Sequence, residues 1–203
     1  MTTGQVQRTG GRSVGCWPDE GWKPAYAEPV SWIKERGKAM QVILHVNEEE
    51  KTWEAAPGEL LIDTLRGHGY FGVKRGCESG DCGACAVLVD GRAVNACVTF
   101  TGSVAGRGVL TIEGLATPES LHPIQKSFLD CGAVQCGFCI PAMVLLAKAL
   151  LNDNPNPSEA DVRKTLGGIL CRCTGYQKPV EAILLAAERI QQGSGRSPGN
   201  GRG

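Results

Sequence analysis

The stretch that decides the fold of this chain is Gly-Cys-Glu-Ser-Gly-Asp-Cys-Gly-Ala-Cys, residues 76–85. It gathers three cysteines, Cys77, Cys82 and Cys85, into one short loop, and Cys97 follows after an interval of 11 residues. Glycines in such a loop permit turns that direct backbone N–H groups at sulfur. The pattern C-x4-C-x2-C-x11-C therefore predicts a loop that folds around a metal-containing group.

The spacing of these four cysteines favours one kind of metal group over another. C-x4-C-x2-C is the spacing of plant-type ferredoxins, in which cysteine thiolates hold a [2Fe–2S] cluster. Zinc is the alternative, but zinc motifs have short paired spacings on both sides, which intervals of four and 11 residues do not supply. We therefore expect a [2Fe–2S] cluster to be held by Cys77, Cys82, Cys85 and Cys97.

The residues on either side of the loop predict a small α+β domain. Short apolar runs and alternation indicate strands, and Asp90-Gly91 suits a tight hairpin turn because glycine accepts positive φ. The expected elements are strands at 41–47, 51–55, 86–89, 93–98 and 109–112, a turn at 48–50 and a helix at 59–68. Cys97 falls on the second arm of the hairpin, so strand pairing would return it to the loop.

A second group of cysteines lies in the other half of the chain. Cys136, Cys139, Cys171 and Cys173 have the spacing C-x2-C-x31-C-x-C. The first pair alone could be a thioredoxin-like redox site, but no strand precedes it as that motif requires. Two short pairs near helix ends suit a second cluster, and we expect these four cysteines to hold it.

The second half is expected to be all helical. Apolar periodicity predicts four helices, at 123–129, 140–151, 158–166 and 179–192. The third helix opens with Ser-Glu-Ala-Asp, which has the residues of a capping box. The second helix is apolar nearly all round, which indicates a central position. These features predict a compact four-helix domain.

Changes in composition divide the chain into four segments. Residues 41–116 are expected to form the first domain and residues 117–192 the second. Residues 1–40 contain three tryptophans among prolines and no clear period, which favours an extended arm ordered against a partner over a mobile tail. Residues 193–203 are rich in glycine and are expected to be a mobile tail.

The overall composition argues against two kinds of interaction. Lys plus Arg and Asp plus Glu number 21 each, so no field of one sign would attract nucleic acid. The longest apolar run, 140–151, is too short for a transmembrane helix. No export signal is recognisable, so we expect a cytoplasmic protein with reduced thiols. Cys16 and Cys131, which belong to neither group, are then expected to be free thiols.

Together these motifs resemble the small iron–sulfur subunit of xanthine dehydrogenase and related molybdenum hydroxylases. The similarity extends from about Val42 to Ile190. It rests on five motifs: residues 76–85, Asn-Ala-Cys at 95–97, Thr-Ile-Glu-Gly-Leu at 111–115, Gln-Cys-Gly-Phe-Cys at 135–139 and Leu-Cys-Arg-Cys-Thr-Gly-Tyr at 170–176. The resemblance implies an α+β fold, in which a β-grasp ferredoxin domain is followed by an all-α four-helix [2Fe–2S] domain.

The resemblance also implies a function and partners. Electrons would leave a molybdopterin site on a large partner subunit and pass through the two [2Fe–2S] clusters. They would then reach FAD on a third subunit or domain, or another acceptor. Gln135 and Cys173 match family positions that lie against the pterin, and the cluster at residues 77–97 would face the flavin. No catalytic residue is expected in this chain, and the family resemblance is compatible with dimerisation of the complex.

Several alternatives stay open on sequence alone. The substrate of the complex could be a purine, an aldehyde, another N-heterocycle or carbon monoxide, although general similarity favours xanthine dehydrogenase. A free-standing two-cluster ferredoxin is a second function that the first loop permits. A structural zinc module without redox activity is a third.

Overall fold

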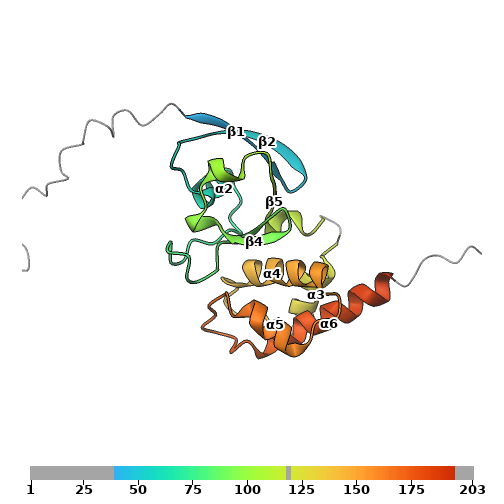
Figure 1. Cartoon of the computed structure of the whole chain (residues 1–203). Helices are drawn as coiled ribbons and strands as arrows, with labels where there is room; N and C mark the ends of the chain where they lie inside the picture. Colours follow the sequence, from blue (N-terminus) through green and yellow to red (C-terminus); the bar gives the residue numbers. More distant parts are fainter. Residues whose placement is uncertain (1–38, 118–119, 195–203) are drawn as a thin grey trace, which may run out of the picture. The chain divides into compact units, whose positions relative to one another are not determined.

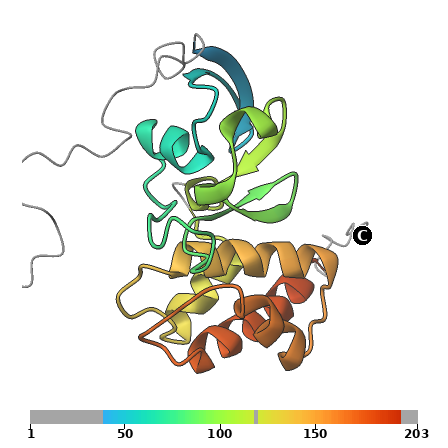
Figure 2. The ribbon, with the colours of Figure 1, turned by 60° about the vertical axis from the view of Figure 1, so that its left-hand side comes forward.

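The computed structural model describes residues 39–117 and 120–194. These residues fall in one compact unit, with strands in its first half and helices in its second (Figures 1 and 2). The predicted arm at 1–40, which contains Cys16, and the predicted tail at 193–203 lie mostly outside the described residues. The described ends of both differ from the prediction, because Met40 begins the strand β1 (Met40–Val46) and the helix α6 (Gln177–Ser194) continues through Gly193 and Ser194.

The first half is built on a mixed five-stranded sheet with the order β2-β1-β5-β3-β4. β1 pairs with β5 in parallel, whereas the other neighbouring strands are antiparallel. Every second side chain of β1 from Val42 to Val46 is buried, as its alternating sequence requires. The strands are β1 (Met40–Val46), β2 (Glu49–Ala55), β3 (Ala86–Val89), β4 (Arg92–Asn95) and β5 (Gly108–Leu110).

Helix α2 (Leu61–Gly67) completes the core of this first half. Its side chains Leu61, Ile62 and Leu65 are fully buried and pack in one cluster with the inward-facing residues of the sheet. The helix begins later than the predicted 59–68. The chain before it is extended and is bonded to the segment after the short 3-10 helix η1 (Ala96–Val98), because the Leu61 N–H donates to the carbonyl oxygen of Thr99.

Both predicted hairpins are present, but the first turns at a different place. Asn47 and Glu48 have φ values of 53° and 70°, and Val46 pairs directly with Glu49. The prediction of a turn at 48–50 was therefore wrong. A two-residue turn with positive φ matches the right-handed twist of paired strands, so this tighter turn is the favoured connection.

The prediction that Cys97 lies on a hairpin strand was also wrong. β4 ends at Asn95, and Cys97 lies in the short 3-10 helix η1 (Ala96–Val98) that follows. The side-chain amide of Asn95 donates to the carbonyl oxygen of Gly80 at 2.8 Å, and the Thr99 hydroxyl donates to the carbonyl oxygen of Asn95. These two bonds bend the chain out of the sheet and towards the cysteine loop.

The second half contains the four predicted helices, and two of them begin with side-chain caps. His122 accepts a hydrogen bond from the Ile124 N–H at the start of α3, and Ser158 and Asp161 form the predicted capping box of α5. The helices are α3 (Pro123–Asp130), α4 (Ile140–Asp153), α5 (Glu159–Leu166) and α6 (Gln177–Ser194). Two further 3-10 helices, η2 (Thr101–Val104) and η3 (Ile112–Gly114), lie in the first half.

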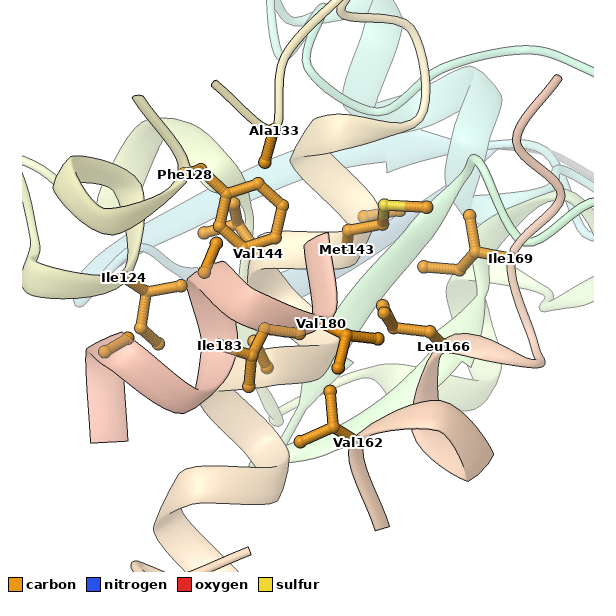
Figure 3. Close-up of a cluster of buried hydrophobic side chains, with 14 of the residues drawn as sticks. Ile124, Phe128, Ala133, Met143, Val144, Val162, Leu166, Ile169, Val180 and Ile183 are labelled. Carbon is orange, nitrogen blue, oxygen red and sulfur yellow. The ribbon is translucent and has the colours of Figure 1, made fainter. Parts of the chain in front are cut away.

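Helix α4 lies between the sheet and the other three helices (Figures 1 and 2). Figure 3 shows the core that it forms, in which Phe128 of α3, Met143 of α4, Leu166 of α5 and Ile183 of α6 converge. This packing explains why α4 is apolar on nearly every side.

The predicted α+β fold, a β-grasp domain followed by a helical domain, is confirmed. In the described part of the chain, no helix combines the length and apolar character needed to cross a membrane.

Candidate metal centres

The structure brings the first four cysteines together at one end of the sheet. Cys77 and Cys82 lie in the loop after α2, Cys85 immediately precedes β3 and Cys97 lies in η1. The Cys77 sulfur accepts hydrogen bonds from the Cys82 N–H at 3.3 Å and the Ser79 N–H at 3.5 Å. Cys85 contacts Cys97 and is near Cys82. The Cys77 side chain also contacts the Cys82 side chain, so the four cysteines form two pairs, Cys77 with Cys82 and Cys85 with Cys97.

Burial differs sharply within this group. Cys77 is exposed, and the N–H donors of Cys82 and Ser79 lower the pKa of its thiol to about 5. Cys85 is buried, and this burial, with the neighbouring Cys97, raises the pKa of its thiol to about 11. A bound cation would favour the thiolate form of both side chains, because metal ligation requires deprotonated cysteine.

The backbone of the loop is shaped to approach sulfur closely. Glu78, Gly80 and Gly83 all have positive φ, between 60° and 87°. A Cβ at Gly76 would lie 2.7 Å from the Cys82 sulfur, so only glycine fits at that position. A loop of this kind suits a group that needs both thiolate ligands and backbone N–H donors, as an iron–sulfur cluster does.

The second four cysteines come from two loops that the helices hold together. Cys136 and Cys139 lie between α3 and α4, and Cys171 and Cys173 lie between α5 and α6. Cys139 contacts Cys171, and Cys136 contacts Cys173. This group is again two pairs, but each pair joins residues that are far apart in the sequence.

Thr174, beside the second group, acts on one of its sulfurs. The Thr174 hydroxyl lies 3.1 Å from the Cys171 sulfur. Although burial opposes the effect, this contact and neighbouring backbone N–H groups lower the pKa of the Cys171 thiol. Burial and the neighbouring Cys171 raise the pKa of Cys139 to about 12. The sequence prediction assigned no role to Thr174, although it directly follows the Cys-x-Cys pair.

Tyr176 fixes the second loop and was also missed. Its hydroxyl accepts a hydrogen bond from the Cys171 N–H at 2.8 Å and donates one to the carbonyl oxygen of Ile169 at 2.9 Å. Tyr176 has a φ of 65°, and Gly175 before it has a φ of 60°. The tyrosine ring thus turns back over the loop, and its hydroxyl holds the Cys171 backbone in position through these two hydrogen bonds.

The two cysteine groups are direct neighbours. The N–H of Leu170, one residue before Cys171, donates to the carbonyl oxygen of Cys82 at 2.9 Å. The ring of Phe138, between Cys136 and Cys139, lies against Gly76. Backbone of one group therefore touches backbone of the other.

Two further residues singled out in the sequence, Gln135 and Cys131, lie near the ends of the helices beside the second group. Gln135 and Cys173 are exposed, and Gln135 directly precedes Cys136. Cys131 is half-buried at the end of α3, outside both cysteine groups. Among residues 39–117 and 120–194, no three His, Cys, Asp or Glu side chains are arranged to hold a single metal ion.

Comparison with known protein families assigns each cysteine group to a domain. Residues 44–105 match the 2Fe-2S iron-sulfur cluster binding domain, and residues 111–184 match the [2Fe-2S] binding domain. Along 135 residues the chain is 42% identical to the xanthine dehydrogenase iron-sulfur-binding subunit of Escherichia coli, covering 64% of this chain and 83% of that one. The chain belongs to the small two-[2Fe–2S] subunits of molybdenum hydroxylases.

Other relatives of this iron–sulfur subunit differ in size and in reaction. The aldehyde oxidoreductase of Megalodesulfovibrio gigas is 45% identical over 163 residues, which are 78% of this chain but only 18% of that protein. In the solved structure of quinoline 2-oxidoreductase from Pseudomonas putida 86, a chain matches with a TM-score of 0.74 and 38% identity, covering 77% of this subunit and 99% of that chain. The subunit therefore corresponds to a whole small chain in some relatives and to one part of a longer chain in others.

Proposed function

We propose that this subunit carries electrons from a molybdopterin site to flavin in a xanthine dehydrogenase-like complex. The observation that supports this most directly is the hydrogen bond from the Leu170 N–H to the carbonyl oxygen of Cys82 at 2.9 Å. It joins the two cysteine groups through one short stretch of backbone. A chain with two such groups in contact is suited to passing electrons between its two ends.

The proposed ligands are the two sets of four cysteines. Cys77, Cys82, Cys85 and Cys97 would hold the first cluster, and Cys136, Cys139, Cys171 and Cys173 the second. A [2Fe–2S] cluster, when bound, takes up and releases one electron at a time. The loop around Cys77 directs N–H groups at sulfur, and Thr174 does the same with a hydroxyl, so the chain can tune each group separately.

The direction of transfer is the one that the family resemblance of Gln135 and Cys173 implies, and the outer faces of the two groups are compatible with it. Gln135 and Cys173 are exposed beside the second group, which leaves that face free for a molybdopterin-binding large subunit. Cys77 is exposed at the first group, which leaves a second face for an FAD-binding subunit. Electrons would then enter near Cys173 and leave near Cys77.

The same proposal covers the limits of the domains, the compartment and the substrate. We place the domain limits at 41–116 and 117–192, and we propose that the segment at 1–40 contacts a partner. We place the complex in the cytoplasm, where reducing conditions keep cysteines available for metal. The xanthine dehydrogenase relative supports a purine substrate, whereas the aldehyde and quinoline relatives make those compounds the first alternatives.

Co-purification from the native source tests the proposal as a whole. We expect four iron atoms per copy of this chain, two distinct reduced [2Fe–2S] signals in electron paramagnetic resonance, and molybdenum and FAD on separate subunits. The complex should oxidise hypoxanthine or xanthine. Oxidation of aldehydes but not of these purines would contradict the purine substrate. A chain that purifies alone with both clusters would favour a free ferredoxin over a subunit of a complex. Zinc in place of iron would contradict the function.

A pair of cysteine variants tests the ligand assignment. Cys173→Ser should abolish the second signal and leave the first, because a cluster needs all four thiolates. Cys131→Ser is the matched control, since this cysteine lies in the same domain but outside both groups, and it should retain four iron atoms. Loss of a signal in the control, or retention of both signals in Cys173→Ser, would contradict the assignment.

A further inference from the structure

We propose that Gly83 is a positioning residue that sets the distance between the two clusters. It lies between Cys82 and Cys85 of the first group, and its missing side chain lets the loop rest directly on the backbone of Gly168. The inference relies on the cysteine ligands proposed above. It concerns how closely the two groups approach, which those ligand assignments leave open.

The steric evidence at Gly83 is a contact with backbone on the other domain. A Cβ at this position would lie 2.1 Å from the carbonyl oxygen of Gly168, 3.1 Å from its carbonyl carbon and 3.1 Å from the Cα of Ile169. Backbone atoms cannot rotate away as a flexible side chain can. Ordinary contact begins at 3.4 Å, so any side chain at Gly83 must push the two segments apart or twist them.

Both sides of this contact are held by the cores behind them. The carbonyl oxygen of Gly83 accepts a hydrogen bond from the Ala86 N–H at the start of β3. On the other side, the Ile169 N–H donates to the carbonyl oxygen of Leu166, and the Ile169 side chain is 1% exposed. Both segments are tied to their own domains by these bonds, so we expect the strain of an added methyl group to widen the spacing between the domains.

The contact lies on the shortest backbone connection between the groups. Cys82, next to Gly83, accepts the hydrogen bond from Leu170, two residues after Gly168. A second contact between the loops joins the Phe138 ring to Gly76, where a Cβ would be 3.8 Å from the ring. Gly83 therefore lies at the closer of two loop contacts between the groups, beside the packing of α4 on β3.

The magnetic interaction of the two clusters reports this separation directly. Dipolar coupling between two paramagnetic centres falls with the cube of their distance. In the fully reduced complex, Gly83→Ala should keep four iron atoms and both signals but show a smaller dipolar splitting than wild type. Electron exchange between the clusters should slow in parallel, and hydrogen exchange at the Leu170 amide should become faster because its bond to Cys82 is stretched.

Two glycine variants serve as controls. Gly91→Ala has the same kind of backbone strain, with a φ of 80°, but a Cβ there meets nothing within 4 Å. Gly168→Ala adds a methyl group to the other side of the contact, where its nearest neighbour would be the Thr165 carbonyl oxygen at 3.8 Å. Both should keep the wild-type splitting, which separates the effect of the clash from backbone strain and from an added methyl group.

The outcomes distinguish this inference from the proposed function. Wild type without two [2Fe–2S] signals would contradict the function itself. A Gly83→Ala protein with both signals and an unchanged splitting would overturn only the positioning role. If Gly83→Ala loses iron, Phe138→Ala provides the test, because this half-exposed ring can be removed without a clash. A changed splitting supports a spacing set by the loop contacts, and an unchanged splitting overturns it.

Discussion

The two cysteine groups of this subunit are chemically alike but are assembled in different ways. The first is contained in one loop, the hairpin that follows it and the short 3-10 helix η1, within 21 residues from Cys77 to Cys97. The second joins Cys136 and Cys139 to cysteines more than 30 residues later, and only the packing of helices α3 to α6 brings the loops together. The first site therefore combines turns close together in the chain with a core that buries Cys85 and Cys97, whereas the second is assembled from distant loops by helix packing.

The surroundings of the two groups follow from this difference. In the first, backbone N–H groups of the loop itself reach the Cys77 sulfur. In the second, the side chains of Thr174 and Tyr176 provide the hydrogen bonds that hold Cys171. A loop can supply its own donors, whereas a site assembled from separate segments uses side chains to fix the segments. Variants in the helical core, at the Tyr176 hydroxyl and in the hairpin should therefore affect the two sites unequally.

The largest effect is expected from damage to the helical core. Leu166 ends α5 and is 1% exposed, and it supports the segment that leads to Cys171. Leu166→Ala should lower the free energy of unfolding by about 2–5 kcal/mol, because it leaves a cavity in a packed core. The second [2Fe–2S] signal should weaken before the first. Urea unfolding and electron paramagnetic resonance measure the two effects.

Leu170 offers a matched control for this variant. It lies four residues later in the same segment, but its side chain is 64% exposed. Leu170→Ala keeps the N–H that bonds to Cys82 and should change the free energy of unfolding by no more than about 0.5 kcal/mol. Equal loss of both signals in Leu166→Ala would show that the two sites share one cooperative unit. It would contradict the idea that the second site depends on the helical core more than the first.

A smaller effect is expected at Tyr176, whose hydroxyl holds the loop of the second site. Tyr176→Phe removes the hydroxyl that bonds to the Cys171 N–H and the Ile169 carbonyl oxygen, and leaves both groups without a partner. The free energy of unfolding should fall by about 1–3 kcal/mol, the cost of unsatisfied buried polar groups. The second signal should broaden while the first stays unchanged. An unaltered free energy of unfolding would mean that water replaces the hydroxyl.

The smallest effect is expected in the hairpin beside the first site. The hydrogen bond from Arg107 at 2.6 Å, followed by that from the Gly108 N–H, holds the pKa of the Asp90 carboxyl below its usual range. A group with a lowered folded pKa stabilises the protein above its unfolded pKa, and this contribution is lost as pH falls through the folded value. Asp90→Asn should therefore lower the melting temperature slightly at neutral pH.

The pH dependence of the Asp90 variant provides its own control. Asparagine also accepts the positive φ of 47° at this turn, so the backbone should be unaffected. The difference in melting temperature between wild type and Asp90→Asn should shrink towards zero in acid. A difference that stays constant down to the lowest pH would show that the charge of Asp90 does not stabilise the hairpin.

Much of the fold could be read from local sequence patterns. The four helices, the Ser158 capping box and the Asp90-Gly91 turn depend on residues close together in the chain, and all are present. Two local predictions failed where distant contacts decided the outcome. The pairing of Val46 with Glu49 set the first turn, and the bond between Asn95 and Gly80 took Cys97 off the strand.

The sequence by itself determined which cysteines form the two groups and which helices and strands surround them, because spacing and periodicity act over a few residues. Only the tertiary structure decided that Cys139 meets Cys171, that Leu170 bonds to Cys82 and that Gly83 rests on Gly168. Each of these contacts joins residues at least 32 positions apart in the chain. Such contacts depend on how whole elements pack, and no local pattern records that packing.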